Sequence, residues 1–156
     1  MTKIITDLMT APLPSKNKQR KLVFRPTREL ANQTYAALNN IIFDNKLNPN
    51  PTILFRSFPK QWGWCHQHTD DKDAHYCKIR LIRRFYCSQW FTTVLAHEMC
   101  HVYEWEVLRI EATHAAEFFM FKDALRSIGI PLEEAYCTQR WFKYQNILDI
   151  GPTISA

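Results

Sequence analysis

The sequence predicts an α+β domain in which a small three-stranded sheet packs on helices. Segments with the 3.6-residue apolar period of helices lie on both sides of a block of short segments with the two-residue alternation of strands. With 156 residues, of which 46% are hydrophobic, the chain has the size and apolar content of one compact domain.

These patterns divide the chain into three parts. Residues 1–22 are polar and become basic toward their end, so we expect a flexible N-terminal arm there. Residues 23–131 contain the helix and strand patterns and constitute the predicted domain. Residues 132–156 form a C-terminal extension that lacks the paired cysteines of a zinc ribbon. The side chains of the arm and the extension that could contact phosphate groups are Lys16, Lys18, Arg20, Lys21, Arg140, Trp141, Lys143 and Tyr144.

The first predicted helix begins at Thr27, after Pro26, because apolar side chains then recur near one face. The asparagines and prolines of DNKLNPNP end this helix. Three strands are expected next, at 52–57, 62–68 and 75–82. The polar segment TDDKDA is the expected tip of a hairpin between the last two strands.

Two further helices are expected after the strands. One runs from about Ser88 through Trp105, and the other covers THAAEFFMFKDALRSIGIP, where Gly129 and Pro131 are stop signals. The buried stripe of this last helix is predicted to consist of Phe118, Phe121, Leu125 and Ile128.

Composition narrows the class of protein. The net charge of +5, from 20 Lys and Arg against 15 Asp and Glu, is compatible with a polyanionic partner and equally with an ordinary basic surface. No apolar run reaches the length of a membrane-spanning helix, and the N-terminus lacks the apolar segment of a signal peptide. The five cysteines form no CxxC pair, which argues against a disulfide framework and favours a reducing cytoplasm.

The segment VLAHEMCHVYEW, inside the predicted helix over 88–105, carries the pattern HExxH. Positions i and i+4 of a helix lie on one face, so His97 and His101 can both present ring nitrogens to one Zn²⁺. Glu98 lies beside them and can reach a water on the metal without being a ligand. In zinc proteases such a glutamate accepts the proton of the water and passes it to the leaving amine, while zinc polarises the scissile carbonyl. The alternative is a buried helix in which both histidines have ordinary hydrogen-bond partners and bind no metal.

A catalytic zinc needs three protein ligands and one open position. His114 is the best candidate for the third ligand, because it opens the next predicted helix after a connection long enough to reverse direction. A carboxylate is the rival third ligand, and the candidates are Glu111 and Glu117. The pattern HExxHxxGxxH is excluded, because the sequence has Glu104 and Val107 where that pattern needs glycine and histidine.

LAHEMCHVYEW followed by THAAEFFMF resembles the SprT-like metalloproteases, which have HEMxH on one helix and a third histidine opening the next, followed closely by Glu-Phe. The hairpin WGWCHQH…CKIRLI and the helix TRELANQTYAALNNIIFDNKL are also similar to that family, so the resemblance spans roughly residues 27–130. The chain departs from those relatives that carry a C-terminal zinc ribbon or a long partner-binding tail.

The resemblance implies a zincin-like metalloprotease fold and an activity against proteins bound or crosslinked to DNA. Glu98 is the general base that it implies. The zinc ligands that it implies are His97, His101 and His114.

Three other groups of residues have weaker functional claims. Trp62 and Trp64 share a strand face and could stack on the bases of single-stranded DNA, although core packing is the commoner role of such residues. The segment CHQHTDDKDAH offers histidines and aspartates for a second metal site, although a solvated hairpin tip is the simpler interpretation. Cys100 points away from the zinc face of its helix and is expected to be a small core residue.

Three functions remain after these observations. The first is a zinc-dependent endopeptidase that acts on DNA-bound or DNA-crosslinked proteins, with single-stranded or damaged DNA as a second partner. Its substrate would pair as an added strand along a sheet edge, for which we expect the strand at 75–82. The second is a zinc-stabilised, DNA-associating module without catalysis, although Glu98 argues against it because a structural zinc site needs no general base. The third is a peptidase with a dedicated protein target and no requirement for DNA.

Overall fold

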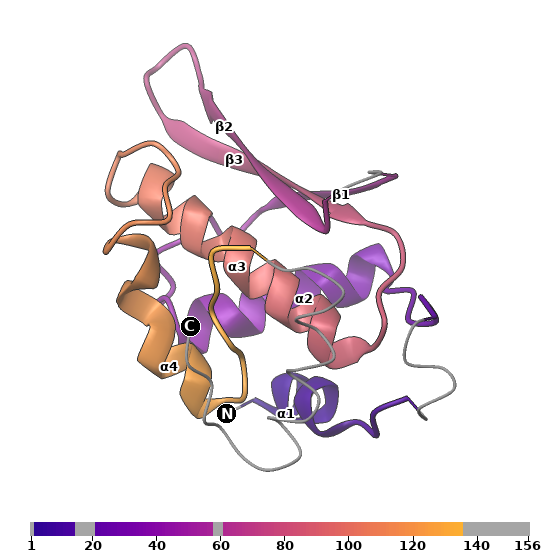
Figure 1. Cartoon of the computed structure of the whole chain (residues 1–156). Helices are drawn as coiled ribbons and strands as arrows, with labels where there is room; N and C mark the ends of the chain where they lie inside the picture. The colour runs from indigo at the N-terminus through magenta and orange to yellow at the C-terminus, as the bar shows by residue number, and fades with distance from the viewer. Residues whose placement is uncertain (1, 15–20, 58–60, 136–156) are drawn as a thin grey trace.

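The computed structural model describes residues 2–14, 21–57 and 61–135. Four α-helices, one short 3-10 helix and three strands make up this part of the chain (Figure 1). In chain order they are α1 (Lys3–Thr10), α2 (Arg28–Ile41), β1 (Thr52–Arg56), β2 (Gly63–Thr69), β3 (His75–Ile82), α3 (Ser88–Glu106), η1 (Phe118–Phe121) and α4 (Lys122–Ser127). This is the predicted α+β class, with a small three-stranded sheet packed on helices. Within these described ranges, no helix is long and apolar enough to cross a membrane.

The helices and strands between residues 28 and 106 confirm the sequence-based predictions closely. α2 begins where Thr27 acts as an N-cap, because the side-chain oxygen of Thr27 accepts a hydrogen bond from the Leu30 amide at 3.0 Å. At the hairpin tip, Asp70 Oδ1 accepts hydrogen bonds from the amides of Lys72 and Ala74. The TDDKDA segment is therefore a turn stabilised by its own side chains, as predicted.

The sheet has the strand order β1-β3-β2, with β1 parallel and β2 antiparallel to β3. β3 is therefore the central strand, and the prediction that residues 75–82 form a free edge is wrong. The hairpin places β2 on one side of β3, and β1 occupies the other side because Ile53 pairs beside Ile79 and both side chains are buried. The strand with an open edge next to α3 is β2.

α3 is the central element of the core, and it is buried along nearly its whole length. Figure 1 shows the sheet on one side of α3 and α1 on the other. The side chains of β3 that alternate toward α3 are Cys77, Ile79 and Leu81, and all three are buried. Cys100 is 1% exposed, which confirms its prediction as a core residue.

The N-terminal residues differ from the predicted flexible arm. Residues Lys3–Thr10 form a helix in which Ile5 and Leu8 are buried, one turn apart, and pack into the core. Ser88 Oγ at the start of α3 donates a hydrogen bond to the Leu8 carbonyl at 2.7 Å, which joins the two helices. The arm prediction is therefore wrong for these residues, because their apolar side chains recur at helical spacing and find a buried surface. The basic residues Lys16, Lys18 and Arg20 lie outside the described residues.

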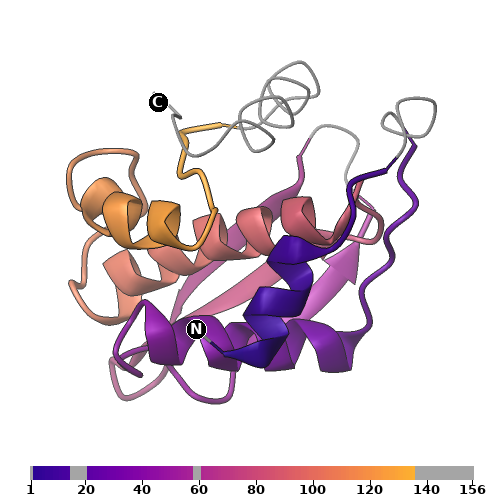
Figure 2. The same ribbon diagram turned by 90° about the horizontal axis from the view of Figure 1, so that it is seen from below.

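The last predicted helix begins later than expected. Residues 107–117 form a connection, and helical structure starts only at Phe118. Phe118 and Leu125 are fully buried as predicted, whereas Phe121 and Ile128 are partly buried. Gly129, with φ of 88°, ends the helix in the left-handed conformation that favours glycine. The segment that follows it turns back from the end of α4 toward the middle of α3 in Figure 1, and in Figure 2 it lies on the same side of α3 as α4. The residues Arg140, Trp141, Lys143 and Tyr144 lie outside the described residues.

Candidate metal centre

His97, Glu98 and His101 lie in the buried middle of α3. They are 7%, 5% and 7% exposed, respectively. The rings of His97 and His101, one helical turn apart, have centroids separated by 5.0 Å. The helix therefore presents both histidines on the same face, as the HExxH spacing predicts.

The connection after α3 brings His114 to these two histidines. Its ring centroid lies 5.4 Å from that of His97 and 4.9 Å from that of His101. One ligand atom from each of the three histidines can be chosen so that all lie within 4.8 Å of one another, and this group could hold a metal ion. Glu111 and Glu117 do not belong to it. In the parts of the chain that the structure describes, this is the one such group, so the histidines and aspartates of the hairpin form no second site.

Phe118 is the floor under the three histidine rings. It is fully buried, and its ring centroid lies 4.8 Å from His97, 4.6 Å from His101 and 4.9 Å from His114. An apolar ring in contact with all three histidines excludes water from below them and restricts their rotamers. The sequence pattern identified Phe118 as a core residue but not as a part of the site.

Burial keeps the two helical histidines in the form that binds metals. The pKa of His97 is lowered to about 3, first by burial and then by the neighbouring His101 and His114. Burial also lowers the pKa of His101, against the opposing effect of Glu104. Both rings are therefore neutral at pH 7, and a neutral imidazole has the lone pair that a metal requires. The backbone of Glu133, from the segment after α4, makes a further hydrogen bond with His97.

Glu98 is a buried carboxyl at the edge of the histidine cluster. Burial raises its pKa to about 8. Gly63 of β2 packs against it so closely that a methyl group at position 63 would lie 3.2 Å from Glu98 Cγ. A carboxyl with this environment is able to accept a proton and release it again near neutral pH.

The histidines and Glu98 open into a pocket with a volume of about 360 Å³. One wall consists of residues 61–65, which lead into and begin β2, and α3 contributes Val94, His97, Glu98 and His101. The other wall includes Ala112, His114, Glu134 and Ala135. Trp62 and Trp64 both line this pocket. Trp64 is 45% exposed, whereas Trp62 also packs against the core rings of Phe85, Tyr86 and Trp90.

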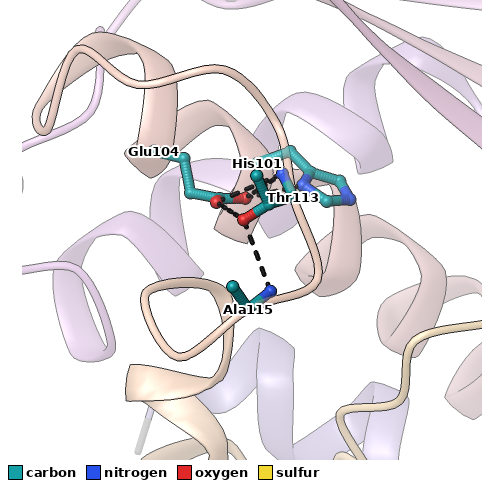
Figure 3. Close-up of polar contacts among 4 residues, drawn as sticks. All are labelled: His101, Glu104, Thr113 and Ala115. Atoms are coloured by element: carbon teal, nitrogen blue, oxygen red, sulfur yellow. Dashed lines mark hydrogen bonds and ion pairs between the residues drawn. The ribbon is translucent and has the colours of Figure 1, made fainter.

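Glu104, on α3, contacts both His101 and Thr113, the residue before His114 in the segment that follows the helix (Figure 3). Its Oε1 lies 2.8 Å from His101 Nδ1, and its Oε2 accepts a hydrogen bond of 2.8 Å from the Thr113 hydroxyl. Sequence reasoning considered Glu104 only as the residue that excludes a glycine-containing motif. The signal that could have identified it is its position three residues after His101, on the same helical face.

Comparison with known proteins identifies one family. The sequence model of the SprT-like family matches residues 31–137. A search of curated proteins found no match, and a search of solved structures found none.

Proposed function

We propose that this chain, which belongs to the SprT-like family, is a zinc-dependent endopeptidase. The single observation that carries the proposal is the meeting of three histidines with a buried carboxyl, Glu98, in one open pocket. Three nitrogen ligands with access for a further group fit the donor set of a catalytic zinc rather than a structural one, which fills all four positions with protein ligands. The residues that would hold the zinc are His97, His101 and His114.

Zinc bound there would supply a Lewis acid for the scissile carbonyl and would lower the pKa of an attacking water. Glu98 would take the proton from that water and deliver it to the leaving amine. The buried position of Glu98 suits this role, because burial raises the pKa of its carboxyl group and so strengthens its hold on a proton in transit. Phe118 and the core residues below would exclude other water from the reacting groups.

The open edge of β2 is the surface that we propose for the substrate backbone. The Ile82 amide donates a hydrogen bond to the Trp62 carbonyl at 3.0 Å, so residues 62 and 82 form a hydrogen-bonded pair. In an antiparallel ladder the next residue, Gly63, directs its amide and carbonyl away from β3. Those groups border the pocket and could pair with an extended peptide. Main-chain pairing of this kind predicts weak preference for substrate side chains.

We further propose that the protein substrates are bound or crosslinked to DNA. The support is the outer face of the sheet, where a run of stacked rings lies beside basic side chains. The centroids of Trp64 and His66 are 4.9 Å apart, with their planes 20° apart, and the cross-strand partners of these two residues are Arg80 and Lys78. Exposed aromatic faces and positive charges are the features that hold single-stranded DNA without sequence preference.

Digestion of a DNA-binding protein by the zinc-loaded chain, with and without single-stranded DNA, tests both proposals. The Glu98→Gln variant keeps the shape of the side chain but removes the general base, and it is the matched control. Cleavage that needs both Glu98 and DNA would support the full proposal. Cleavage that needs Glu98 but not DNA would indicate a peptidase with a dedicated protein target. No cleavage by a zinc-bound chain would contradict the peptidase proposal and favour a binding module.

A Trp64→Ala variant isolates the contribution of the outer face of the sheet to DNA binding. Trp64 is exposed, so its loss leaves the core intact. Base stacking on one aromatic ring contributes about 1–3 kcal/mol, so the affinity for single-stranded DNA should fall by at least about fivefold. The affinity should also fall steeply as salt is added. Equal affinity of the variant and the wild type would contradict the placement of DNA on this face.

A further inference from the structure

Glu104 is a completely buried carboxylate near the end of α3, with an exposed fraction of 0%. Among the described residues, no lysine or arginine lies within ion-pair distance of it, and its one possible cationic neighbour is His101. Burying an ionised carboxylate is costly unless hydrogen bonds and a positive charge compensate for the lost hydration. The contacts that compensate for the burial of Glu104 therefore indicate its role.

The first contact fixes the ring of His101. Glu104 Oε1 lies 2.8 Å from His101 Nδ1. The Thr113 amide, which can only donate, lies 3.3 Å from both oxygens of Glu104, so we assign this carboxyl group as an acceptor and Nδ1 as the nitrogen that donates to it. In a neutral ring this leaves the lone pair on Nε2, the other nitrogen, as the atom available to a metal.

The second set of contacts fixes the residue before His114. The Thr113 hydroxyl donates to Glu104 Oε2 at 2.8 Å, and the Thr113 amide lies 3.3 Å from both carboxylate oxygens. The Ala115 amide donates to Thr113 Oγ1 at 3.3 Å, so the hydroxyl proton is directed to Glu104 (Figure 3). Residues 111–117 are exposed, so burial contributes little to holding this part of the connection in place.

We infer that Glu104 is a positioning residue that holds two of the three candidate metal ligands, His101 directly and His114 through Thr113. One carboxylate thereby sets the tautomer of a ligand on the helix and the position of a ligand on the connection. The inference rests on the metal site of the proposed function. It extends that proposal, because the position of His114 then depends on Glu104, a residue outside the HExxH pattern.

The charge of Glu104 also suits a site for a divalent cation. A carboxylate hydrogen-bonded to a metal-binding histidine raises the basicity of that histidine and offsets part of the positive charge of the ion. Replacement of such a partner typically weakens metal binding by about 10–100-fold. Glu104→Gln keeps the size of the side chain and removes the charge, so we expect a loss of zinc affinity in that range.

Zinc affinity, measured by competition with a chromophoric chelator, tests the inference. The variants are Glu104→Gln, Thr113→Val and the matched control Glu106→Gln. Glu106 lies on the same helix and accepts hydrogen bonds from the amides of Asn48 and Cys77, but it has no contact with the histidines. We expect Glu104→Gln to lose about 10–100-fold in affinity, Thr113→Val to lose less, and Glu106→Gln to bind zinc like the wild type.

A second readout uses no metal. Nitrogen NMR of the metal-free chain should show His101 as the Nδ1–H tautomer, and this preference should weaken in Glu104→Gln and persist in Glu106→Gln. A merely structural role for Glu104 would not change the tautomer. If Glu104→Gln does not fold, the tautomer of the wild type and the zinc affinity of Thr113→Val still test the inference.

Zinc affinity of folded Glu104→Gln that equals that of the wild type would overturn the inference, and so would an Nε2–H tautomer of His101 in the wild type. A wild-type chain that binds no zinc would overturn it as well. Neither readout depends on peptide hydrolysis. A chain that binds zinc but cleaves nothing would therefore contradict the peptidase proposal and leave this comparison intact.

Discussion

Gly63→Ala should damage catalysis by disturbing the position of Glu98. A methyl group at position 63 would lie 3.1 Å from Leu81 Cδ2 and 3.2 Å from both Val94 Cγ1 and Glu98 Cγ. Carbon atoms in favourable contact are about 3.5–4.0 Å apart. Leu81 and Val94 are 0% and 1% exposed, so they are packed on all sides and have little room to retreat. Part of the displacement must therefore be taken up by β2 and by the side chain of Glu98.

The size of the effect follows from these contacts. Overpacking of a filled core costs about 1–3 kcal/mol. In a chain of this length, that loss corresponds to a decrease in Tm of about 3–10 °C. A misplacement of about 1 Å can reduce a catalysed rate by about 100-fold, so a shift of Glu98 by a fraction of that distance should reduce kcat by about 3- to 10-fold.

The assay measures kcat for peptide cleavage at a temperature well below the Tm of both proteins, and thermal unfolding is measured separately. Thr69→Ala is the control, because Thr69 is exposed at the far end of the same strand. A variant with a lower Tm but an unchanged kcat would refute the argument that Gly63 allows Glu98 its catalytic position. If both Tm and kcat are unchanged, Gly63 is not packed closely against Leu81, Val94 and Glu98.

Three further predictions test the floor of the site, the N-terminal helix and the metal. Phe118→Ala should lower the free energy of unfolding by about 3–5 kcal/mol and weaken zinc binding. Met120→Ala, at an exposed position, should do neither. Wild-type zinc affinity in folded Phe118→Ala would contradict the role of this ring. Ile5→Ala should lower the free energy of unfolding in urea by about 2–5 kcal/mol. Lys3→Ala should change the free energy of unfolding little. An equally small change in Ile5→Ala would favour the prediction of a flexible N-terminal arm. Removal of metal by a chelator should stop hydrolysis and lower the Tm, and added zinc should reverse both changes; cleavage by the metal-free chain would contradict the peptidase proposal.

The prediction of α3 and of the three strands succeeded because local patterns specify them. The HExxH segment lies in a stretch whose apolar residues recur at helical spacing on more than one face, which indicates a buried helix, and the spacing of four residues then puts His97 and His101 on one face. Strand His75–Ile82 matches its predicted bounds because the apolar residues Cys77, Ile79 and Leu81 alternate with the basic residues Lys78 and Arg80 after a turn signal. Phe118 and Leu125 were predicted as core residues from helical period alone.

The errors share a physical cause. Strand order depends on which edges find partners, and the parallel pairing of β1 with β3 joins segments whose contact no local period encodes. The burial of Ile5 depends on the packing of its helix, α1, against α2 and against α3, whose first residue, Ser88, lies eighty residues after Leu8. The late start of the last helix arises because Glu104 binds Thr113, and Thr113 Oγ1 in turn accepts a hydrogen bond from the Ala115 amide, which gives a turn instead of a helix.

The sequence by itself determined the class of fold, the helix that carries two histidines and a glutamate, and the choice of His114 as the next candidate ligand. Those features follow from periodicity along one segment and from the chemistry of residue types. Only the tertiary structure decided that β2 borders the site, that Phe118 lies under all three rings and that Glu104 joins His101 to Thr113. Each of these is a contact between different segments of the chain. Such contacts depend on how all helices and strands pack together, and the pattern of a single segment does not specify them.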